Sequence, residues 1–571
     1  MHNSPKMSDL PQNALPATNW WQQRFIHQIA LVVVFFCFYA PTLPWIHFRD
    51  GMENFNVLPA VEIARDGAWV VPTLWGHPRL EKPPLVQWIT ALGILAGGPT
   101  EFAARWPSLL MACLMLVIVY EWGRMLGDWR TGLVAAIFAG SSLFFIRFGK
   151  RAAYDVQLAF WVALTNLCLT WALWRGHWWK GGIAAGLALG GAMMSKGPPG
   201  MLHTIAPFAV CCIAMGIWKL RQSEAHAWKW LARAMAVVAM AAVISILVGL
   251  PWVLALASRV GGIRMLLTIW RGEIVLSGEQ VEKLYTSPLT GFVFLALILP
   301  WTGWFIGAAV VAWRRWREKG PVLAYLCVMT VLPVVVHSFA PLVRDRYLVP
   351  MLSAAAVAAA IVYMDMASRF DKRTSQDRLG EWVHWLCLGG IVVAYPIGSA
   401  LSAGNLSQDP GQTPLSWPVA ITLAGVGLAL VVAGILWQRK SPVGLVVGTL
   451  VAMLYFQGVY GFVQNNAPDP LRQVADKIRR TWPDAKIYGY IADLPTKAPP
   501  YNASPPRALA IYLDQTVRTV FSVREIPRRH GRVMILIREE PTEKMPQGSV
   551  RRMVFHDEKW NWALWELPYS R

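Results

Sequence analysis

The chain has 571 residues, of which 55% are hydrophobic and only 15% carry charge, and its mean hydropathy is +0.39. Apolar runs long enough to cross roughly 30 Å of hydrocarbon recur along most of its length, which excludes an ordinary soluble domain and predicts a polytopic α-helical membrane protein. The net charge of +20 does not indicate a nucleic-acid partner, because the basic residues gather in short connectors between the apolar runs.

Residues 1–24 are polar, and we expect them to form a cytoplasmic arm ahead of a first membrane span from Phe25 to His47. A polar loop, residues 48–107, follows; its amphipathic stretch Leu85–Leu95 is expected to lie along the membrane interface. Twelve later apolar segments bring the predicted total to thirteen spans. They are 109–120, 132–145, 158–173, 183–194, 201–217, 235–256, 289–312, 323–339, 348–364, 386–401, 421–436 and 443–462.

Basic residues fill every second connector between the predicted spans, and the positive-inside tendency makes that side cytoplasmic. These residues are Arg124, Arg130, Arg175, Lys180, Lys219, Arg221, Lys229, Arg314, Arg315, Arg317, Lys319, Arg369, Lys372, Arg373, Arg378, Arg439 and Lys440. With thirteen spans, the first loop and everything after residue 463 lie on the outer face, which we predict to be the periplasmic side of a bacterial inner membrane. Arg147, Lys150 and Arg151 run against this pattern, because the same count puts them outside.

The composition changes after the last apolar run, which closes a membrane domain of residues 25–463. Residues Pro470–Thr481 have helical spacing, and Lys486–Tyr490 and Arg532–Ile537 have the pattern of short buried strands. We therefore predict a small periplasmic α/β domain over residues 464–571, a size that can fold independently.

The first loop carries an unusual density of charge for a segment beside a membrane. It reads Arg49-Asp50-Gly51-Met52-Glu53, then Glu62-Ile63-Ala64-Arg65-Asp66-Gly67-Ala68-Trp69, then Leu80-Glu81-Lys82-Pro83-Pro84. Charges next to a membrane are costly to desolvate, so such a cluster predicts a functional site. A charged, lipid-borne substrate that meets catalytic carboxylates fits this pattern.

These motifs, with four later ones in the same order, resemble the GT-C glycosyltransferases, in particular their aminoarabinose-transferase-like and protein O-mannosyltransferase-like branch. The later motifs are Tyr154-Asp155, Ser195-Lys196-Gly197-Pro198, Leu299-Pro300-Trp301 and Arg346-Tyr347-Leu348-Val349-Pro350. The resemblance covers about residues 25–463 and extends to the C-terminal outer domain. It implies transfer of a sugar from a polyprenyl-phosphate carrier to a lipid (lipid A-like), glycan or protein acceptor on the outer face of the membrane.

The transfer needs a carboxylate that deprotonates the attacking group, and Asp50 and Glu53 are the candidates. Counting back from Glu81-Lys82-Pro83 without a gap favours Glu53, whereas an insertion of two residues favours Asp50. The two acids are three residues apart and can face the same way on one helical turn. Asp155 is a third catalytic candidate, although an acid there could equally cap the start of its helix.

The transfer also needs fixed cations, because negative charge develops on the departing phosphate. Lys82, Lys196 and Arg346 are the candidates, and the motifs add Glu81 and Tyr347 as substrate-binding residues. No cofactor and no metal centre is predicted: the seven cysteines lie in apolar runs without metal-ligand spacing. Glu62 and His77 could contribute to a divalent-cation site, but no spacing supports one.

A transporter or flippase of lipid-linked sugars is the alternative function. Transporters commonly show inverted repeats and charged or broken segments near the bilayer midplane. This chain shows no internal repeat, and its charges cluster at the ends of spans on one face. The predicted partners are therefore the polyprenyl-phosphate sugar donor, the acceptor and membrane lipids, without nucleic acid.

Overall fold

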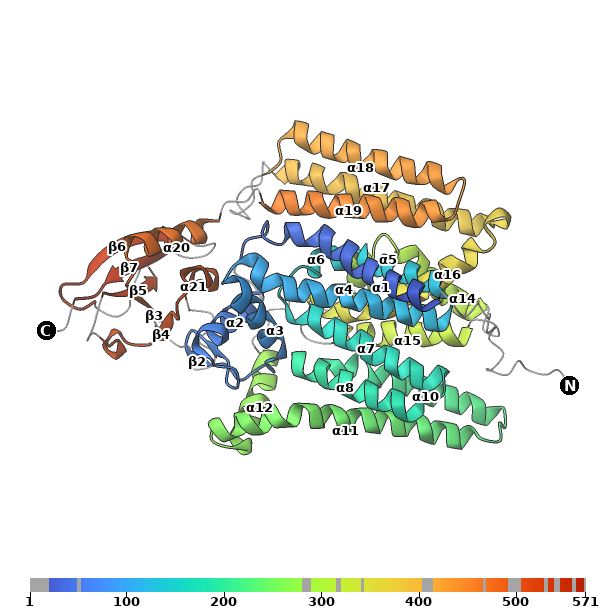
Figure 1. Ribbon diagram of the computed structural model, residues 1–571, viewed down its shortest axis with the longest axis horizontal. Coiled ribbons are helices and arrows are strands. Elements are labelled where there is room, and N and C mark those ends of the chain that lie inside the picture. The colour runs from blue at the N-terminus through green and yellow to red at the C-terminus, as the bar shows by residue number, and fades with distance from the viewer. Residues whose placement is uncertain are drawn as a thin grey trace.

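The computed structural model describes residues 20–48, 53–279, 289–314, 320–339, 344–402, 414–465, 469–490, 505–527, 532–538, 545–556 and 561–568. A long bundle of helices forms the membrane part, and a small α/β unit lies beyond one end of it (Figure 1). Helices α2 and α3 lie between the two, on the side of the bundle that faces the C-terminal unit.

Each predicted apolar segment overlaps a helix of the membrane part, whereas the helices over Asn54–Asp66 and Ile263–Glu279 lie outside those segments. In chain order they are α1 (Trp20–Tyr39), η1 (Ala40–Thr42), α2 (Asn54–Asp66), α3 (Leu85–Gly97), α4 (Glu101–Leu126), α5 (Trp129–Gly140), α6 (Leu143–Phe148), α7 (Tyr154–Trp174), α8 (Trp178–Lys196), α9 (Pro199–Leu202), α10 (Ile205–Arg221), α11 (Ala227–Arg259), α12 (Ile263–Glu279), α13 (Leu289–Leu297), α14 (Thr302–Arg314), α15 (Gly320–Ser338), η2 (Asp345–Met351), α16 (Leu352–Ala367), η3 (Phe370–Lys372), α17 (Ser375–Leu401), α18 (Trp417–Gln438) and α19 (Val443–Asn465). Strands β1 (Thr73–Leu74) and β2 (His77–Pro78) form a small antiparallel pair between α2 and α3.

Ten helices in the described part of the chain are long and apolar enough to cross a membrane, or eleven if α13 and α14 count as one span bent by 115°. The predicted thirteen spans exceed the count of eleven by two segments, which correspond to α5 and α8. Helix α5 has only 12 residues, about 18 Å of helix, and α8 is rich in glycine and begins with two tryptophans and a lysine. The bend between α13 and α14 falls at Leu299-Pro300-Trp301, where proline cannot continue the helical hydrogen bonding.

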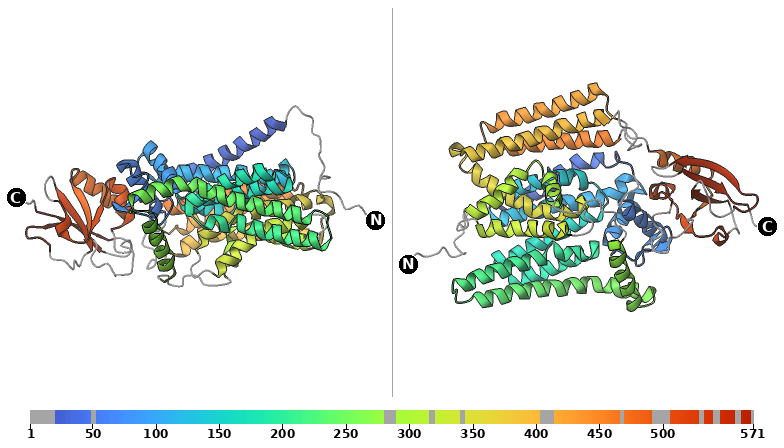
Figure 2. Two further views of the ribbon diagram at one scale, coloured as in Figure 1. Left: turned by 90° about the horizontal axis from the view of Figure 1, so that it is seen from below. Right: turned by 180° about the vertical axis from the view of Figure 1, so that it is seen from behind.

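Three of the basic connectors lie at the end of the bundle remote from the C-terminal unit. Helix α10 turns into α11 there, α16 leads into α17 there, and α18 turns into α19 there (Figures 1 and 2). This arrangement agrees with the predicted segregation of lysine and arginine to one side. The assignment of that side to the cytoplasm stays a prediction.

Small residues allow the central helices to approach closely. A Cβ atom added at Gly132 of α5 would come within 2.4 Å of the backbone oxygen of Tyr120 in α4. In α16 the run Ala354–Ala360 is buried throughout. Close backbone approach of this kind replaces the hydrophobic driving force that helices lack inside a bilayer.

The C-terminal unit confirms the predicted α/β pattern. Its elements are α20 (Pro470–Thr481), β3 (Lys486–Tyr490), α21 (Arg507–Leu513), β4 (Arg518–Val520), η6 (Val523–Glu525), β5 (Val533–Arg538), β6 (Val550–His556) and β7 (Asn561–Glu566). The five-stranded sheet has the order β4-β3-β5-β7-β6. Strands β4 and β5 run parallel to β3, whereas β7 is antiparallel to both β5 and β6.

This unit packs on the first loop instead of standing apart from the membrane part. One buried apolar cluster joins Phe48 and Trp75 of the loop to Leu471 and Ile511 of the C-terminal unit. The backbone N–H of Thr519 also donates to the carbonyl oxygen of Trp75 at 3.3 Å. The loop predicted to hold the chemistry is thus covered by the C-terminal unit.

Candidate active site

Asp155, Lys196 and Arg346 meet at the ends of three separate helices. Asp155 lies in the first turn of α7, and its side chain is only 4% exposed. The ammonium of Lys196, the last residue of α8, pairs with Oδ1 of Asp155. Nε of Arg346, in η2, lies 3.3 Å from Oδ2 of the same carboxylate. The structure therefore brings together three residues that the sequence analysis had singled out one at a time.

The local sequence explains how Lys196 and Arg346 reach Asp155. Gly197 ends α8 with φ of +79°, a conformation that L side chains rarely adopt, and the chain turns away directly after Lys196. The ring of Tyr347, the predicted substrate-binding tyrosine, lies 4.0 Å from the Lys196 ammonium nitrogen. Such a cation–π contact holds the lysine in place without neutralising it.

The cluster around Asp155 carries more positive than negative charge. Lys196 and Arg346 share one carboxylate, and Arg344 lies close enough to repel Lys196. Nη2 of Arg346 is buried and has no hydrogen-bond partner among the described residues. A buried donor left unsatisfied costs roughly 1–3 kcal/mol, and more when it is charged. An anion that accepts from this nitrogen would remove that cost.

Glu53, which the sequence analysis proposed as an alternative base to Asp50, has a different environment from that of Asp155. Its Oε1 accepts from Nε of Arg105 at 2.7 Å and from the backbone N–H of Ala152 at 2.8 Å, and its Oε2 accepts from Nη2 of Arg105 at 2.9 Å. Burial by itself would raise the pKa of Glu53, but the Arg105 guanidinium and these hydrogen bonds hold that pKa below its usual range. A carboxylate committed in this way binds a proton poorly, which disfavours it as a general base.

Asp50 lies outside the described residues, but the segments on both sides of it are anchored. Nη1 of Arg105 donates to the carbonyl oxygens of Leu43, at 2.8 Å, and of Ile46. The backbone N–H of Phe48 donates to the Tyr512 hydroxyl at 3.0 Å. Arg105 therefore ties the chain before residue 49 to Glu53 after residue 52.

Glu81 and Lys82 lie in the turn that leads into α3. Oε2 of Glu81 accepts from Nε of the buried Arg79 at 3.1 Å. The guanidinium carbon of Arg79 is 6.0 Å from the ring centroid of Tyr154, the residue before Asp155. Lys82 is half-buried. Glu81 thus contacts Arg79, and Arg79 contacts the residue that precedes Asp155.

Two buried cations were missed by the sequence analysis as site residues. Arg105 could have been found, because a lone arginine near the start of an apolar helix must have a partner. Lys150 was noted only as an exception to the charge pattern. Its side chain is buried, and its Nζ lies 3.4 Å from Oγ1 of Thr42. Burial, helped by Arg105 and Arg151, lowers the pKa of Lys150 to about 7.

Glu62 and His77, the candidate ligands of a divalent cation, have other partners in the structure. Oε2 of Glu62 accepts from Oγ1 of Thr73 at 2.5 Å, and burial raises the pKa of this carboxyl in spite of that bond. A ring nitrogen of His77 lies 2.8 Å from the carbonyl oxygen of Thr519. These two side chains therefore contribute to packing of the loop and to its contact with the C-terminal unit.

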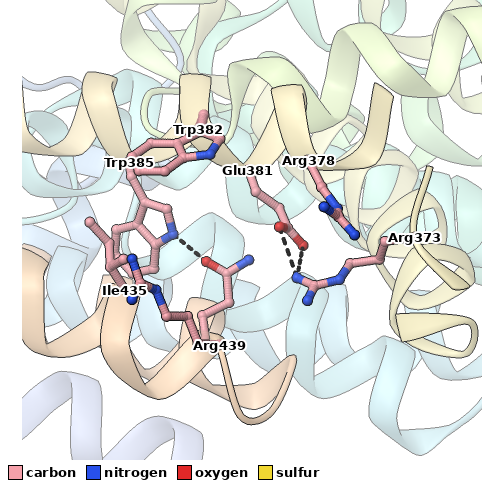
Figure 3. Close-up of a pocket in the computed structure, with 8 residues that line it drawn as sticks. Arg373, Arg378, Glu381, Trp382, Trp385, Ile435 and Arg439 are labelled. Atoms are coloured by element: carbon pink, nitrogen blue, oxygen red, sulfur yellow. Dashed lines mark hydrogen bonds and ion pairs between the residues drawn. The ribbon is translucent and has the colours of Figure 1, made fainter. Parts of the chain in front are cut away.

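A cavity of about 350 Å³ lies at the other end of the bundle, between the start of α17 and the end of α18 (Figure 3). In it, Nη1 of Arg373 is 3.0 Å from each carboxylate oxygen of Glu381. None of the predicted site residues lines this cavity. The lining is Arg373, Arg378, Glu381, Trp382, Trp385, Ile435, Gln438 and Arg439.

Comparison with known sequences supports the resemblance. The model of the dolichyl-phosphate-mannose-protein mannosyltransferase family matches residues 81–246. The undecaprenyl phosphate-alpha-4-amino-4-deoxy-L-arabinose arabinosyl transferase 2 of Proteus mirabilis is 30% identical over 383 residues, 64% of each chain. The corresponding transferase of Yersinia enterocolitica is 27% identical over 323 residues, 55% of this chain and 54% of that one. The matched region spans less than two thirds of either relative.

Two solved structures share the fold across nearly the whole chain. The crystal structure of ArnT from Cupriavidus metallidurans in the apo state superposes with a TM-score of 0.70 at 15% identity and covers 95% of this chain and 98% of that one. The structure of the same protein bound to undecaprenyl phosphate gives a TM-score of 0.68 at 16% identity, with 94% and 97% covered. The predicted fold class, a polytopic helical membrane protein of GT-C type with a small C-terminal α/β part, is confirmed.

Proposed function

We propose that this chain, an aminoarabinose-transferase-like protein with the GT-C fold, moves a sugar from a polyprenyl-phosphate carrier to an acceptor on the outer face of the membrane. The relatives are named for transfer of aminoarabinose from undecaprenyl phosphate, and ArnT of Cupriavidus metallidurans has been crystallised with undecaprenyl phosphate. The acceptor would be a lipid (lipid A-like), a glycan or a protein.

The observation that carries this proposal is the excess of positive charge around Asp155, with one buried Arg346 nitrogen that has no hydrogen-bond partner. When the sugar leaves, the bond between its anomeric carbon and the phosphate oxygen breaks, and negative charge develops on that oxygen. Lys196 and Arg346 are fixed in advance by Asp155 and Tyr347, so they need little rearrangement to stabilise it.

Asp155 has an indirect role in this mechanism. Its carboxylate holds both cations within reach of one point and reduces their mutual repulsion. We therefore treat it as a positioning residue, and not as the base.

Asp50 is the base in this proposal, because both oxygens of Glu53 are already bound by Arg105 and Ala152. For a hydroxyl acceptor, the acceptor oxygen bonds to the anomeric carbon and its proton passes to the Asp50 carboxylate. The polyprenyl phosphate then departs as an anion. Glu53 keeps the start of α2 in position next to this step.

The test is a transfer assay with the purified full-length protein and undecaprenyl-phosphate aminoarabinose as the donor probe. Arg346→Gln and Lys196→Gln should each lower the transfer rate by roughly a hundredfold or more, the usual effect of losing one donor to a developing oxyanion. Arg147→Gln is the matched control, because Arg147 is half exposed and pairs with Asp345 instead of Asp155.

Mass spectrometry of the product separates transfer from translocation. A new glycosylated acceptor, formed in detergent without a membrane to cross, supports a transferase. Normal transfer rates in both cation variants would contradict the role of the Asp155 cluster, and a donor moved across vesicles without any product would favour the transporter.

A further inference from the structure

A second charged cluster lies where the C-terminal unit meets the membrane part, and the proposed reaction makes no use of it. It contains His47, in the loop that follows η1, Glu101, the first residue of α4, and Asp469, directly before α20. One ligand atom from each residue lies within 4.8 Å of the other two. Three chain segments that are far apart in the sequence thus converge on one point.

The distances from the His47 ring nitrogen to the two carboxylates are too long for hydrogen bonds but suit a bound cation. Nδ1 of His47 lies 3.6 Å from Oε1 of Glu101 and 3.6 Å from Oδ2 of Asp469. This nitrogen is buried and has no hydrogen-bond partner among the described residues. Zn²⁺ holds nitrogen and oxygen ligands at about 2.0–2.2 Å, so neighbouring ligands in a tetrahedral or trigonal arrangement are roughly 3.3–3.7 Å apart.

The contacts of the Tyr512 hydroxyl indicate that the same cluster lacks a positive charge. Its oxygen lies 2.9 Å from Oε1 of Glu101 and 2.6 Å from Oδ2 of Asp469. A hydroxyl carries one proton, so it can donate to only one of these two carboxylates. Its lone pair also accepts from the N–H of Phe48. One carboxylate oxygen therefore faces the hydroxyl oxygen without a proton between them.

The charges near the cluster leave this repulsion only partly compensated. Glu101 and Asp469 are at most 9% exposed, and together they carry two negative charges. Nη1 of Arg472 approaches Glu101 at 3.3 Å, but its side chain is 47% exposed and supplies a single positive charge. Arg105, the next cation, is committed to Glu53.

We propose that His47, Glu101 and Asp469 bind a divalent cation of the zinc class, which fastens the C-terminal unit to the membrane part. Imidazole nitrogens and carboxylate oxygens are both ligands of Zn²⁺, and three protein ligands leave a fourth position for water. The imidazole nitrogen disfavours Mg²⁺, which prefers oxygen ligands. Tyr512 would orient the two ligating carboxylates, as hydrogen-bonding neighbours of metal ligands usually do.

The experiment measures metal binding by the full-length protein, purified in detergent without a histidine tag and freed of metal with EDTA. Zn²⁺ is added, excess ion is removed, and bound metal per chain is counted by mass spectrometry. We expect about one Zn²⁺ per chain and a rise in melting temperature that grows with free Zn²⁺. Mg²⁺ at the same concentration should produce neither effect.

Two substitutions test the ligands and leave the cap of α20 in place. His47→Gln deletes the imidazole, and Asp469→Asn replaces one ligating oxygen while its other oxygen can still cap α20 by accepting from the N–H of Arg472. Each should weaken Zn²⁺ binding at least tenfold. His556→Gln is the control, because His556 is exposed and its ring nitrogen contacts Oδ1 of Asn561, far from the cluster in the sequence.

Two results would overturn the proposal. One is equal Zn²⁺ binding by the unaltered protein and His47→Gln, which would put the metal elsewhere. The other is no Zn²⁺ binding by the unaltered protein and no rise in its melting temperature with Zn²⁺. Neither result depends on sugar transfer, so the proposed function is judged separately.

Discussion

The two carboxylate clusters beside the first loop, around Asp155 and around Glu53, have similar composition but different hydrogen bonding. The Glu53 carboxylate accepts from two nitrogens of Arg105 and from one backbone N–H. The remaining nitrogen of Arg105 donates to backbone oxygens. Asp155 has two cations of its own, and one of them keeps a buried nitrogen without a partner. The Glu53 cluster is closed, and the Asp155 cluster can accept another anion.

An unsatisfied buried donor distinguishes a binding site from a structural ion pair better than the number of charges does. Breaking a closed, buried pair leaves an uncompensated charge and should lower the stability of the protein strongly. Losing one cation from an open cluster should leave the fold intact and remove a ligand contact. Substitutions can therefore test which description fits each cluster.

The largest effect is expected for Asp50→Asn. If Asp50 is the base, the transfer rate should fall by about a hundredfold to ten-thousandfold, with an unchanged melting temperature. Glu53→Gln should show the reverse, a lower melting temperature with near-normal turnover per folded molecule. Initial rates and thermal melts of both purified variants decide the matter. A large rate loss in Glu53→Gln at an unchanged melting temperature would reverse the two assignments.

Arg105→Met should have the largest effect on stability. It leaves Glu53 buried without its cation, a change that typically costs roughly 3–5 kcal/mol. The measurement is thermal unfolding in detergent. In the double variant Glu53→Gln with Arg105→Met, no charge is stranded, so part of the loss should return. A double variant less stable than Arg105→Met alone would show that the pair is not a closed unit.

Lys150→Met should stabilise the protein in a way that depends on pH. Since burial holds the pKa of Lys150 at about 7, below its usual 10.5, the unfolded chain binds more protons between these two values. The cost of burying the ammonium is therefore complete below pH 7 and disappears as the pH rises towards 10.5. The gain from the substitution should be larger at pH 6 than at pH 9, by about 3 kcal/mol.

Thermal melts at the two pH values test the Lys150 prediction, with Lys477→Met on the exposed face of α20 as the control. The control should show the same small change at both values. An equal gain at pH 6 and pH 9 for Lys150→Met would mean that the lysine remains charged in the folded protein.

The smallest effect is expected for Arg147→Gln. Its guanidinium pairs with Asp345 at 2.8 Å, but the two side chains are 49% and 29% exposed. Exposed pairs of this kind contribute about 0–1 kcal/mol. Unfolding measurements should therefore hardly distinguish the variant from the unaltered protein. A loss as large as that of Arg105→Met would show that exposure does not separate the two kinds of ion pair here.

Much of the site was visible in the sequence, but the relations among its residues were not. Asp155, Lys196, Arg346 and Tyr347 were each chosen from short motifs, and the structure joins all four. The choice between Asp50 and Glu53 stayed open, because spacing along one turn does not reveal that an arginine from α4 occupies Glu53. Arg105, His47 and Asp469 were overlooked for the same reason: each acquires its significance from a distant partner.

The sequence by itself determined the membrane character, the segregation of basic connectors and two of the five strands of the C-terminal unit, β3 and β5. Hydropathy, charge placement and two-residue alternation are local properties, so a single stretch of chain is sufficient to read them. Only the tertiary structure decided which charges are satisfied, where α13 and α14 bend, and that the C-terminal unit covers the first loop. The free energy of a buried charge depends on the groups around it, and those groups come from helices far apart in the sequence.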